Sequence, residues 1–176
     1  EAKRIKKFIE DQELHPVAIL LTHGHFDHVM AVDSVRAAYH IPVYAAEAEK
    51  ETMQDASINL SINMGGAMLS VEADHWLKDG ETITLLDQEV RCILTPGHTV
   101  GGMCFYFPKA GMLFSGDTLF QESVGRTDFP GGSMSEIVRS IREKLFVLPD
   151  AVQVYPGHGL MTSIKNEKMF NPFAVE

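Results

Sequence analysis

The stretch LLTHGHFDHVMAV, from Leu20 to Val32, places three histidines and an aspartate within six residues: His23, His25, Asp27 and His28. The whole chain contains only 8 histidines, so this short segment holds a large share of them. An apolar run, VAILL, leads into the cluster and is typical of a buried strand. The sequence therefore predicts a strand that ends in a turn rich in metal-ligating side chains.

The composition is that of an ordinary globular protein, with 45% apolar and 22% charged residues. At 176 residues the chain can bury a core of its own, and we expect one domain over residues 1–176. A net charge of −9 and a pI of about 5.3 argue against nucleic acid and anionic membranes as partners. The apolar runs fall far short of the roughly 20 residues that a membrane span needs.

The two cysteines, Cys92 and Cys104, lie in apolar segments with strand-like patterns. They form neither a C-x-x-C pair nor a disulfide framework, which is typical of a reducing compartment. We interpret both as small buried hydrophobic side chains and expect a cytoplasmic protein.

Apolar patterns divide the chain into a first half of helices and strands and a second half rich in short strands. We expect helices over residues 4–12, 28–40, 46–56, 133–146 and 162–170. We expect strands over residues 17–22, 42–46, 81–87, 89–96, 103–108, 111–117 and 152–159. Strands that alternate with helices in each half indicate an α/β fold, with sheets covered by helices.

The segment SMSEIVRSIREKLF, residues 133–146, has the clearest helical pattern. Ser133 and Glu136 have the spacing of a capping box at its start. Ile137, Ile141 and Leu145 recur at i, i+4 and i+8, so they should form its buried face.

Three further strand ends carry ligand-type residues: TPGHTVGG holds His98, FSGDTLF holds Asp117 and VYPGHG holds His158. With the first cluster they make seven such residues, all just beyond strand ends. Strand ends of a layered α/β fold meet at one rim, where ligand sites are found. His15, His40 and His75 have no comparable setting, and we interpret them as surface or core histidines.

Imidazole and carboxylate donors without thiolate suit zinc, iron or manganese. Seven donors are too many for one tetrahedral ion, but two ions that share one bridging carboxylate would use them all. His23 and His25, two residues apart on an extended turn, can face the same ion. Asp27 and His28, at a helix start, diverge by about a quarter turn or more and can reach the other.

The motifs THGHFDH, PGHT, SGD and YPGHG, in this order, resemble those of the metallo-β-lactamase superfamily. The stretch GDTLFQESVGRTDFPGG, followed by GHG and the closing NPF, is most similar to its glyoxalase II-like (hydroxyacylglutathione hydrolase-like) branch. The resemblance runs from about Val17 to Phe173.

The resemblance implies an αββα sandwich, with two mixed β-sheets face to face and helices on the outer faces. It also implies that N-terminal strands are missing here, since family members usually begin with two or more strands before the first helix. The first metal would be held by His23, His25 and His98. The second would be held by Asp27, His28 and His158, with Asp117 as the bridge.

A metal ion lowers the pKa of bound water from 15.7 to about 7, so that hydroxide is available at neutral pH. We expect such a bridging hydroxide, oriented by Asp27, to attack a carbonyl, and two divalent ions to stabilise the oxyanion. Zinc is our first choice of metal, and Asp27 and Asp117 are the expected catalytic residues. The resemblance points to a small-molecule acyl thioester, and it leaves the acyl group, the thiol carrier and the oligomeric state open.

The sequence leaves two other functions open. One is a persulfide dioxygenase-like enzyme with a single iron held by two histidines and an aspartate. The other is a metal-binding protein without turnover, since a site can be present yet too loose to work. We favour β-lactam hydrolysis less, because the loops resemble the thioesterase-like branch, and we expect no nucleic-acid-processing role.

Two loops beside the predicted site have alternative interpretations. In GRTDFPGG, Arg126 could pair with an anionic substrate, but we favour a buried arginine that fixes the loop. The segment NLSINMGGAM, residues 59–68, could form an apolar flap, but we favour methionines that fill the core.

Overall fold

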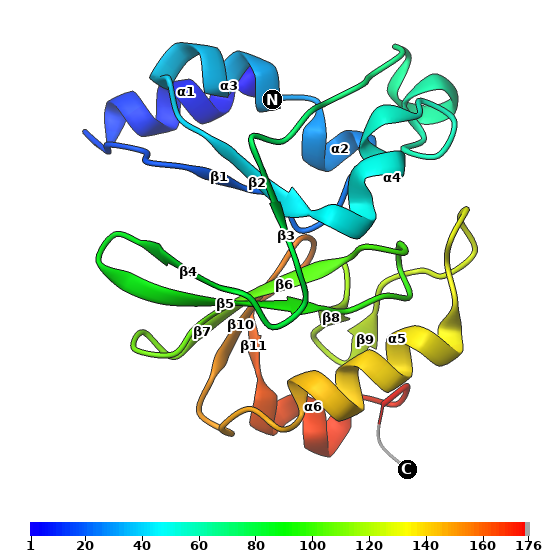
Figure 1. The fold of residues 1–176 in the computed structure, drawn as a ribbon. Coiled ribbons are helices and arrows are strands. Elements are labelled where there is room, and N and C mark those ends of the chain that lie inside the picture. Colours follow the sequence, from blue (N-terminus) through cyan, green and yellow to red (C-terminus); the bar gives the residue numbers. More distant parts are fainter. Residues whose placement is uncertain (175–176) are drawn as a thin grey trace.

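Figure 1 shows the computed structural model, which describes residues 1–174, as two β-sheets packed face to face with helices on both outer sides. This arrangement confirms the α/β fold and the αββα sandwich. Among residues 1–174, no helix combines the length and the apolarity that crossing a bilayer requires.

The smaller sheet has the order β1-β2-β3, and both of its strand pairs are parallel. Its strands are β1 (Ile19–Leu20), β2 (Val43–Ala46) and β3 (His75–Leu77). The helical elements of this half are α1 (Ala2–Asp11), α2 (Phe26–Val29), α3 (Val32–Tyr39), the 3₁₀ turn η1 (Glu47–Glu49), α4 (Lys50–Gln54) and the π-helical turn η2 (Ser61–Gly65). Helices α1 and α3 lie over its outer face (Figure 1).

The larger sheet is mixed and has the order β11-β10-β7-β6-β5-β4, in which only β10 and β7 run parallel. Its strands are β4 (Thr82–Leu85), β5 (Gln88–Leu94), β6 (Met103–Phe107), β7 (Met112–Gly116), β10 (Gln153–Pro156) and β11 (Thr162–Ser163). A separate hairpin joins β8 (Leu119–Phe120) to β9 (Ser123–Val124). The outer face is covered by α5 (Met134–Ser140), the π-helical turn η3 (Ile141–Leu145) and α6 (Ile164–Phe170).

The single helix expected over residues 28–40 is wrong, because the structure has two helices there. The backbone ladder of α2 ends with the Met30 N–H bonded to the Phe26 carbonyl, and a new ladder begins where Val35 N–H bonds to Ala31 O. Helix α2 also starts earlier than expected, at Phe26. The short strands β3, β8, β9 and β11 escaped prediction because two or three residues are too few to show an alternating pattern.

The helix predicted from residue 133 is present, but only half of its capping box forms. Ser133 Oγ accepts a hydrogen bond from the Glu136 N–H at 3.4 Å. The Ser133 N–H donates instead to Gly97 O at 2.8 Å, and the Glu136 carboxylate pairs with Arg139 at 2.5 Å. The cap therefore also ties the start of α5 to the loop that carries His98.

Three apolar clusters hold the layers together. One lies between the sheets and includes Val90, Cys92, Met103 and Phe105. A second joins the smaller sheet to α2, α3 and α4, and contains Val29, Val32, Val43 and Met53. The third packs α5 and η3 against the larger sheet: Cys104, Leu113, Ile137, Ile141, Leu145 and Val154 are central to it.

The expected buried face of the α5–η3 segment can be tested by truncation. Ile141 is fully buried, so Ile141→Ala should leave a cavity and lower the free energy of unfolding by about 2–5 kcal/mol. Urea denaturation followed by circular dichroism measures this. Met134, on the same segment but 45% exposed, is the control, and Met134→Ala should stay within about 0.5 kcal/mol. Equal effects of the two substitutions would contradict the assigned face.

Candidate metal centre

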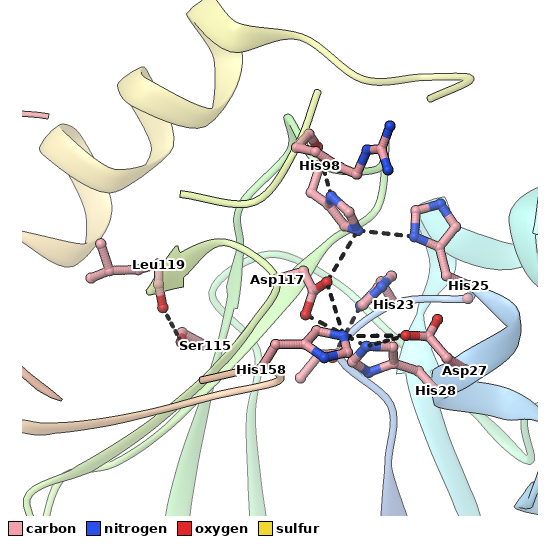
Figure 2. Close-up of polar contacts among 12 residues, drawn as sticks. His23, His25, Asp27, His28, His98, Ser115, Asp117, Leu119 and His158 are labelled. Carbon is pink, nitrogen blue, oxygen red and sulfur yellow. Dashed lines mark hydrogen bonds and ion pairs between the residues drawn. The ribbon is translucent and has the colours of Figure 1, made fainter. Parts of the chain in front are cut away.

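All seven candidate ligands come together at one rim of the sandwich (Figure 2). The smaller sheet supplies four of them: His23 and His25 follow β1, and Asp27 and His28 lie in α2. The larger sheet supplies the other three, on the loops after β5, β7 and β10: His98, Asp117 and His158. The cluster therefore exists only where the two sheets meet.

Three overlapping groups within the cluster have the spacing of a metal site. In each group, one donor atom from every residue lies within 4.8 Å of the others. The groups are His23, His25 and His98; His23, His28 and Asp117; and Asp27, His28 and His158. The first and third correspond to the two triads that the resemblance implied, and the second links them.

Asp117 lies at the centre of the cluster, between the triads (Figure 2). Its Oδ2 is 3.6 Å from His98 Nε2 and 3.5 Å from His158 Nε2, and its Oδ1 is 3.5 Å from His28 Nε2. These separations are long for direct hydrogen bonds. Two ligands of one tetrahedral ion at about 2.1 Å each are about 3.4 Å apart, so the spacing fits donors that share a cation.

Hydrogen bonds orient two of the imidazoles toward the centre. His98 Nδ1 lies 2.7 Å from the Arg126 carbonyl oxygen, which can only accept, so Nδ1 carries the proton. His98 Nε2, on the other side of the ring, lies 2.9 Å from His25 Nδ1. His23 Nδ1 likewise lies 3.2 Å from Thr22 Oγ1, on the ring side away from Nε2. Fixing one ring nitrogen in this way is how proteins present the other to a metal.

Three buried polar atoms of the cluster have no hydrogen-bond partner among the described residues: His23 Nε2, His25 Nε2 and Asp117 Oδ1. His23 and His25 are only 2% and 3% exposed, so water does not readily satisfy them. Buried polar groups without partners are rare in proteins, and a bound ion is one of the explanations for them. The residues present thus fit divalent cations, which the fold family implies, because cations satisfy lone pairs on nitrogen and oxygen.

The pKa values of three histidines also favour the ligand form. Burial lowers the pKa of His25 to about 4, with His98 adding to the shift. Burial likewise lowers the pKa of His23 well below its usual value, and that of His28 to a lesser extent. These rings are therefore neutral at pH 7, and their lone pairs are open to a metal. Burial raises the pKa of Asp117, an effect that a neighbouring cation would reverse.

Two glycines, Gly157 and Gly116, allow the ligand loops of the two sheets to pack closely together. A Cβ at Gly157 would overlap Asp117 Oδ1 and lie 2.8 Å from His28 Cε1. At Gly116 the backbone has φ of +51°, and a Cβ would meet Thr22 Cβ at 2.5 Å. Side chains at these positions would push the two sheets' ligand loops apart.

A cavity of about 470 Å³ opens onto the cluster. Its walls are mainly apolar, with contributions from Phe26, Leu60, Met64, Phe120 and Phe129. No local pattern in the sequence marks these residues as a group, because they come from four separate segments. His15, His40 and His75, which the sequence assigned to either the surface or the core, are all exposed.

Two expectations about this cavity are wrong. Arg126 is not buried: its side chain is 55% exposed, pairs with both carboxylate oxygens of Asp128 at 2.7 Å and lies over the Phe129 ring. The methionines of residues 59–68 are not core filler, since Met64 is 57% and Met68 78% exposed. Arginine and methionine patterns in glycine-rich loops do not reveal burial, because the path of the loop decides it.

Comparison with known proteins places the chain in a family. The profile described as Metallo-beta-lactamase superfamily matches residues 1–158. A relative from Bacillus subtilis (strain 168), named "Probable metallo-hydrolase YqgX", is 40% identical over 98% of this chain and 82% of its own length. The "Hydroxyacylglutathione hydrolase GloC" of Haemophilus influenzae is 35% identical, with the same coverage, and supports the glyoxalase II-like branch.

Solved structures agree with this placement. A structure described as BLEG-1 B3 metallo-beta-lactamase superposes with a TM-score of 0.94 at 39% identity, covering 100% of this chain and 85% of that one. Another, of TTHA1623 in a di-iron-bound form, has a TM-score of 0.86 at 34% identity, covering 98% and 85%. With a family match over most of its length, this chain belongs to the metallo-β-lactamase superfamily of metal-dependent hydrolases.

Proposed function

We propose that this protein is a binuclear metallohydrolase that cleaves a small-molecule acyl thioester. One divalent cation would be held by His23, His25 and His98. The other would be held by Asp27, His28 and His158, and Asp117 would contact both. The observation that carries this proposal is the convergence of seven nitrogen and oxygen donors, three of whose atoms are buried without a partner among the described residues.

When bound, the cations would supply Lewis acidity and lower the pKa of a water molecule into the neutral range. Asp27 lines the cavity and its side chain is 39% exposed, so its carboxylate can accept a hydrogen bond from the attacking water and orient it. His158 Nε2 lies 3.2 Å from Asp27 Oδ2, a separation that suits two ligands of one cation. Asp27 and Asp117 are accordingly our candidates for the catalytic residues.

The lining of the cavity supports a thioester as the substrate. Outside the seven-residue cluster, Arg126 is the charged residue among those that line it, and Asp128 already neutralises that side chain. A departing amine needs a proton from a general acid, whereas a thiolate does not. A cavity whose walls outside the cluster are mainly apolar is therefore compatible with a thioester substrate. The name of the Haemophilus relative points to the same bond class.

Zinc is our proposed metal, because neutral imidazoles and carboxylates are among its usual ligands. Iron is the alternative, since the TTHA1623 structure is described as di-iron-bound. We also propose a cytoplasmic location, supported by two free and buried thiols, Cys92 and Cys104.

The proposal is tested by turnover assays on protein stripped with a chelator and reloaded with zinc, iron or manganese. Hydrolysis of S-acyl thioesters, lost on stripping and restored by metal, is the expected result. β-Lactam hydrolysis is a second candidate, favoured by the similarity to BLEG-1, which is described as a metallo-beta-lactamase. Cleavage of a β-lactam, or oxygen consumption with a persulfide, in the absence of thioester cleavage would overturn the proposal. Metal uptake without any turnover would do so as well.

Asp117 provides a direct test of the shared ligand. Asp117→Asn keeps the shape but removes the anion between the triads, so cation content should drop below two per chain and thioester turnover should fall roughly 10²-fold or more. Metal analysis and the assay above measure both quantities. Asp128→Asn, at an exposed carboxylate beside the same cavity, is the control and should retain both cations. Two cations and full turnover in Asp117→Asn would exclude the bridging role.

Gly157 tests the packing of the cluster without removing a ligand. The new Cβ of Gly157→Ala should displace the Asp117 carboxylate from His28 and reduce the cation content measured by mass spectrometry. Gly111→Ala is the matched control. It has a φ of +65° and open space around it, so it should cost about 1–2 kcal/mol of stability but no metal. Unchanged metal content in Gly157→Ala would show that the cluster tolerates expansion.

A further inference from the structure

Glu49, the last residue of η1, is a buried carboxylate with a full set of donors. The residue is only 1% exposed. Oε1 accepts from the Gly24 N–H at 3.0 Å, and Oε2 accepts from Thr99 Oγ1 at 3.0 Å. Thr52 and the Gly101 N–H donate to the same carboxylate. The Gly24 and Gly101 N–H groups can only donate, and the Thr99 hydroxyl donates here, so the carboxylate accepts on both of its oxygens.

Three of these four donors belong to the two loops that carry the first triad, and the fourth, Thr52, lies in α4. Gly24 lies between His23 and His25, and Thr99 directly follows His98. The loop of His98 approaches Glu49 so closely that a Cβ at Gly101 would lie 2.5 Å from Oε2 and would overlap the Glu49 backbone nitrogen. One carboxylate thus ties a loop of the smaller sheet to a loop of the larger sheet.

We infer that Glu49 is a positioning residue that holds His23, His25 and His98 at the spacing of a single cation site. This inference rests on the proposed function, since it assigns Glu49 a role in the proposed first metal site. Hydrogen bonds to the backbone at Gly24 and Gly101 fix the loops, and the bond to Thr99 fixes the residue next to His98. These bonds from Glu49 reach no member of the second triad, Asp27, His28 and His158.

A carboxylate suits this set of donors better than an amide of the same shape. Burial raises the pKa of Glu49, and the four hydrogen bonds oppose that shift. A glutamine amide has one acceptor oxygen and one NH₂ group, so it would lose the Gly24 bond in one orientation and force the Thr99 bond to reverse in the other. The loops would then separate at the first triad, while the second would keep its geometry.

Glu167 offers a matched control at a distance from the first triad. It is also fully buried, and it accepts from the Glu122 N–H, Thr162 Oγ1, Asn166 Nδ2 and Asn171 Nδ2. Its donors, however, lie around α6 and include no neighbour of His23, His25 or His98. Glu167→Gln therefore reproduces the loss of a buried acceptor without touching those loops.

The experiment measures zinc affinity by competition between chelator-stripped protein and a chromophoric chelator, with circular dichroism as a check on folding. Wild type and Glu167→Gln should bind two Zn²⁺ per chain with the same affinities. Glu49→Gln should bind one ion as the wild type does and the other about 10–100-fold more weakly. Repeating the titration in a His158→Ala background, which weakens the second triad, assigns the weakened ion to the first.

Unchanged affinity for both ions in folded Glu49→Gln would overturn the inference, as would equal weakening of both. If Glu49→Gln does not fold, Thr99→Val decides instead, because it removes one donor at nearly constant volume and should weaken the same ion. Fewer than two ions in the wild type would contradict the binuclear proposal. In that case, the Zn²⁺ affinity of the single occupied site, compared between Glu49→Gln and Glu167→Gln, would still decide the role of Glu49.

Discussion

The convergence of seven nitrogen and oxygen donors at one rim, with three of their buried atoms lacking a partner among the described residues, is the constraint on which this structure depends. Ring nitrogens of His25 and His98 lie 2.9 Å apart, and Asp117 is surrounded by three imidazoles at 3.5–3.6 Å. Without positive charge between them, such groups give up hydration and gain little in return. Bound cations would offset this cost and raise the free energy of unfolding, because an ion that binds only the folded state favours folding.

The constraint can be met only because the two sheets are held in a fixed relation. The Met103 N–H donates to Thr22 O at 2.8 Å, which joins β6 to the loop after β1. Gly116 allows the end of β7 to approach Thr22, and Glu49 joins the loops of His23–His25 and His98. The candidate metal centre therefore lies where the two sheets are joined. Substitutions in the core between the sheets should alter the spacing of the ligands through these contacts.

The residues that would select the substrate differ from the candidate metal ligands that would carry out the hydrolysis. A protein described as a metallo-beta-lactamase and a relative named hydroxyacylglutathione hydrolase are 39% and 35% identical to this chain. The bond that is cleaved must then depend on what surrounds the ligands. Here that is an apolar wall with contributions from Met64, Phe120 and Phe129, beside an arginine already paired with Asp128. Loops carry this lining, and loops can vary without disturbing the sheets.

The sequence by itself determined the fold class and the seven candidate ligands, because ligand motifs such as THGHFDH and YPGHG are local and follow recognisable strands. It also determined the buried face of the α5–η3 segment, since periodicity marks Ile137, Ile141 and Leu145 directly. Only the tertiary structure decided where α2 ends, that Arg126 and Met64 are exposed, and that Glu49 lies beneath the first triad. Those features arise from contacts between segments far apart in the chain, such as the 50 residues that separate Glu49 from Thr99, and no local pattern encodes them.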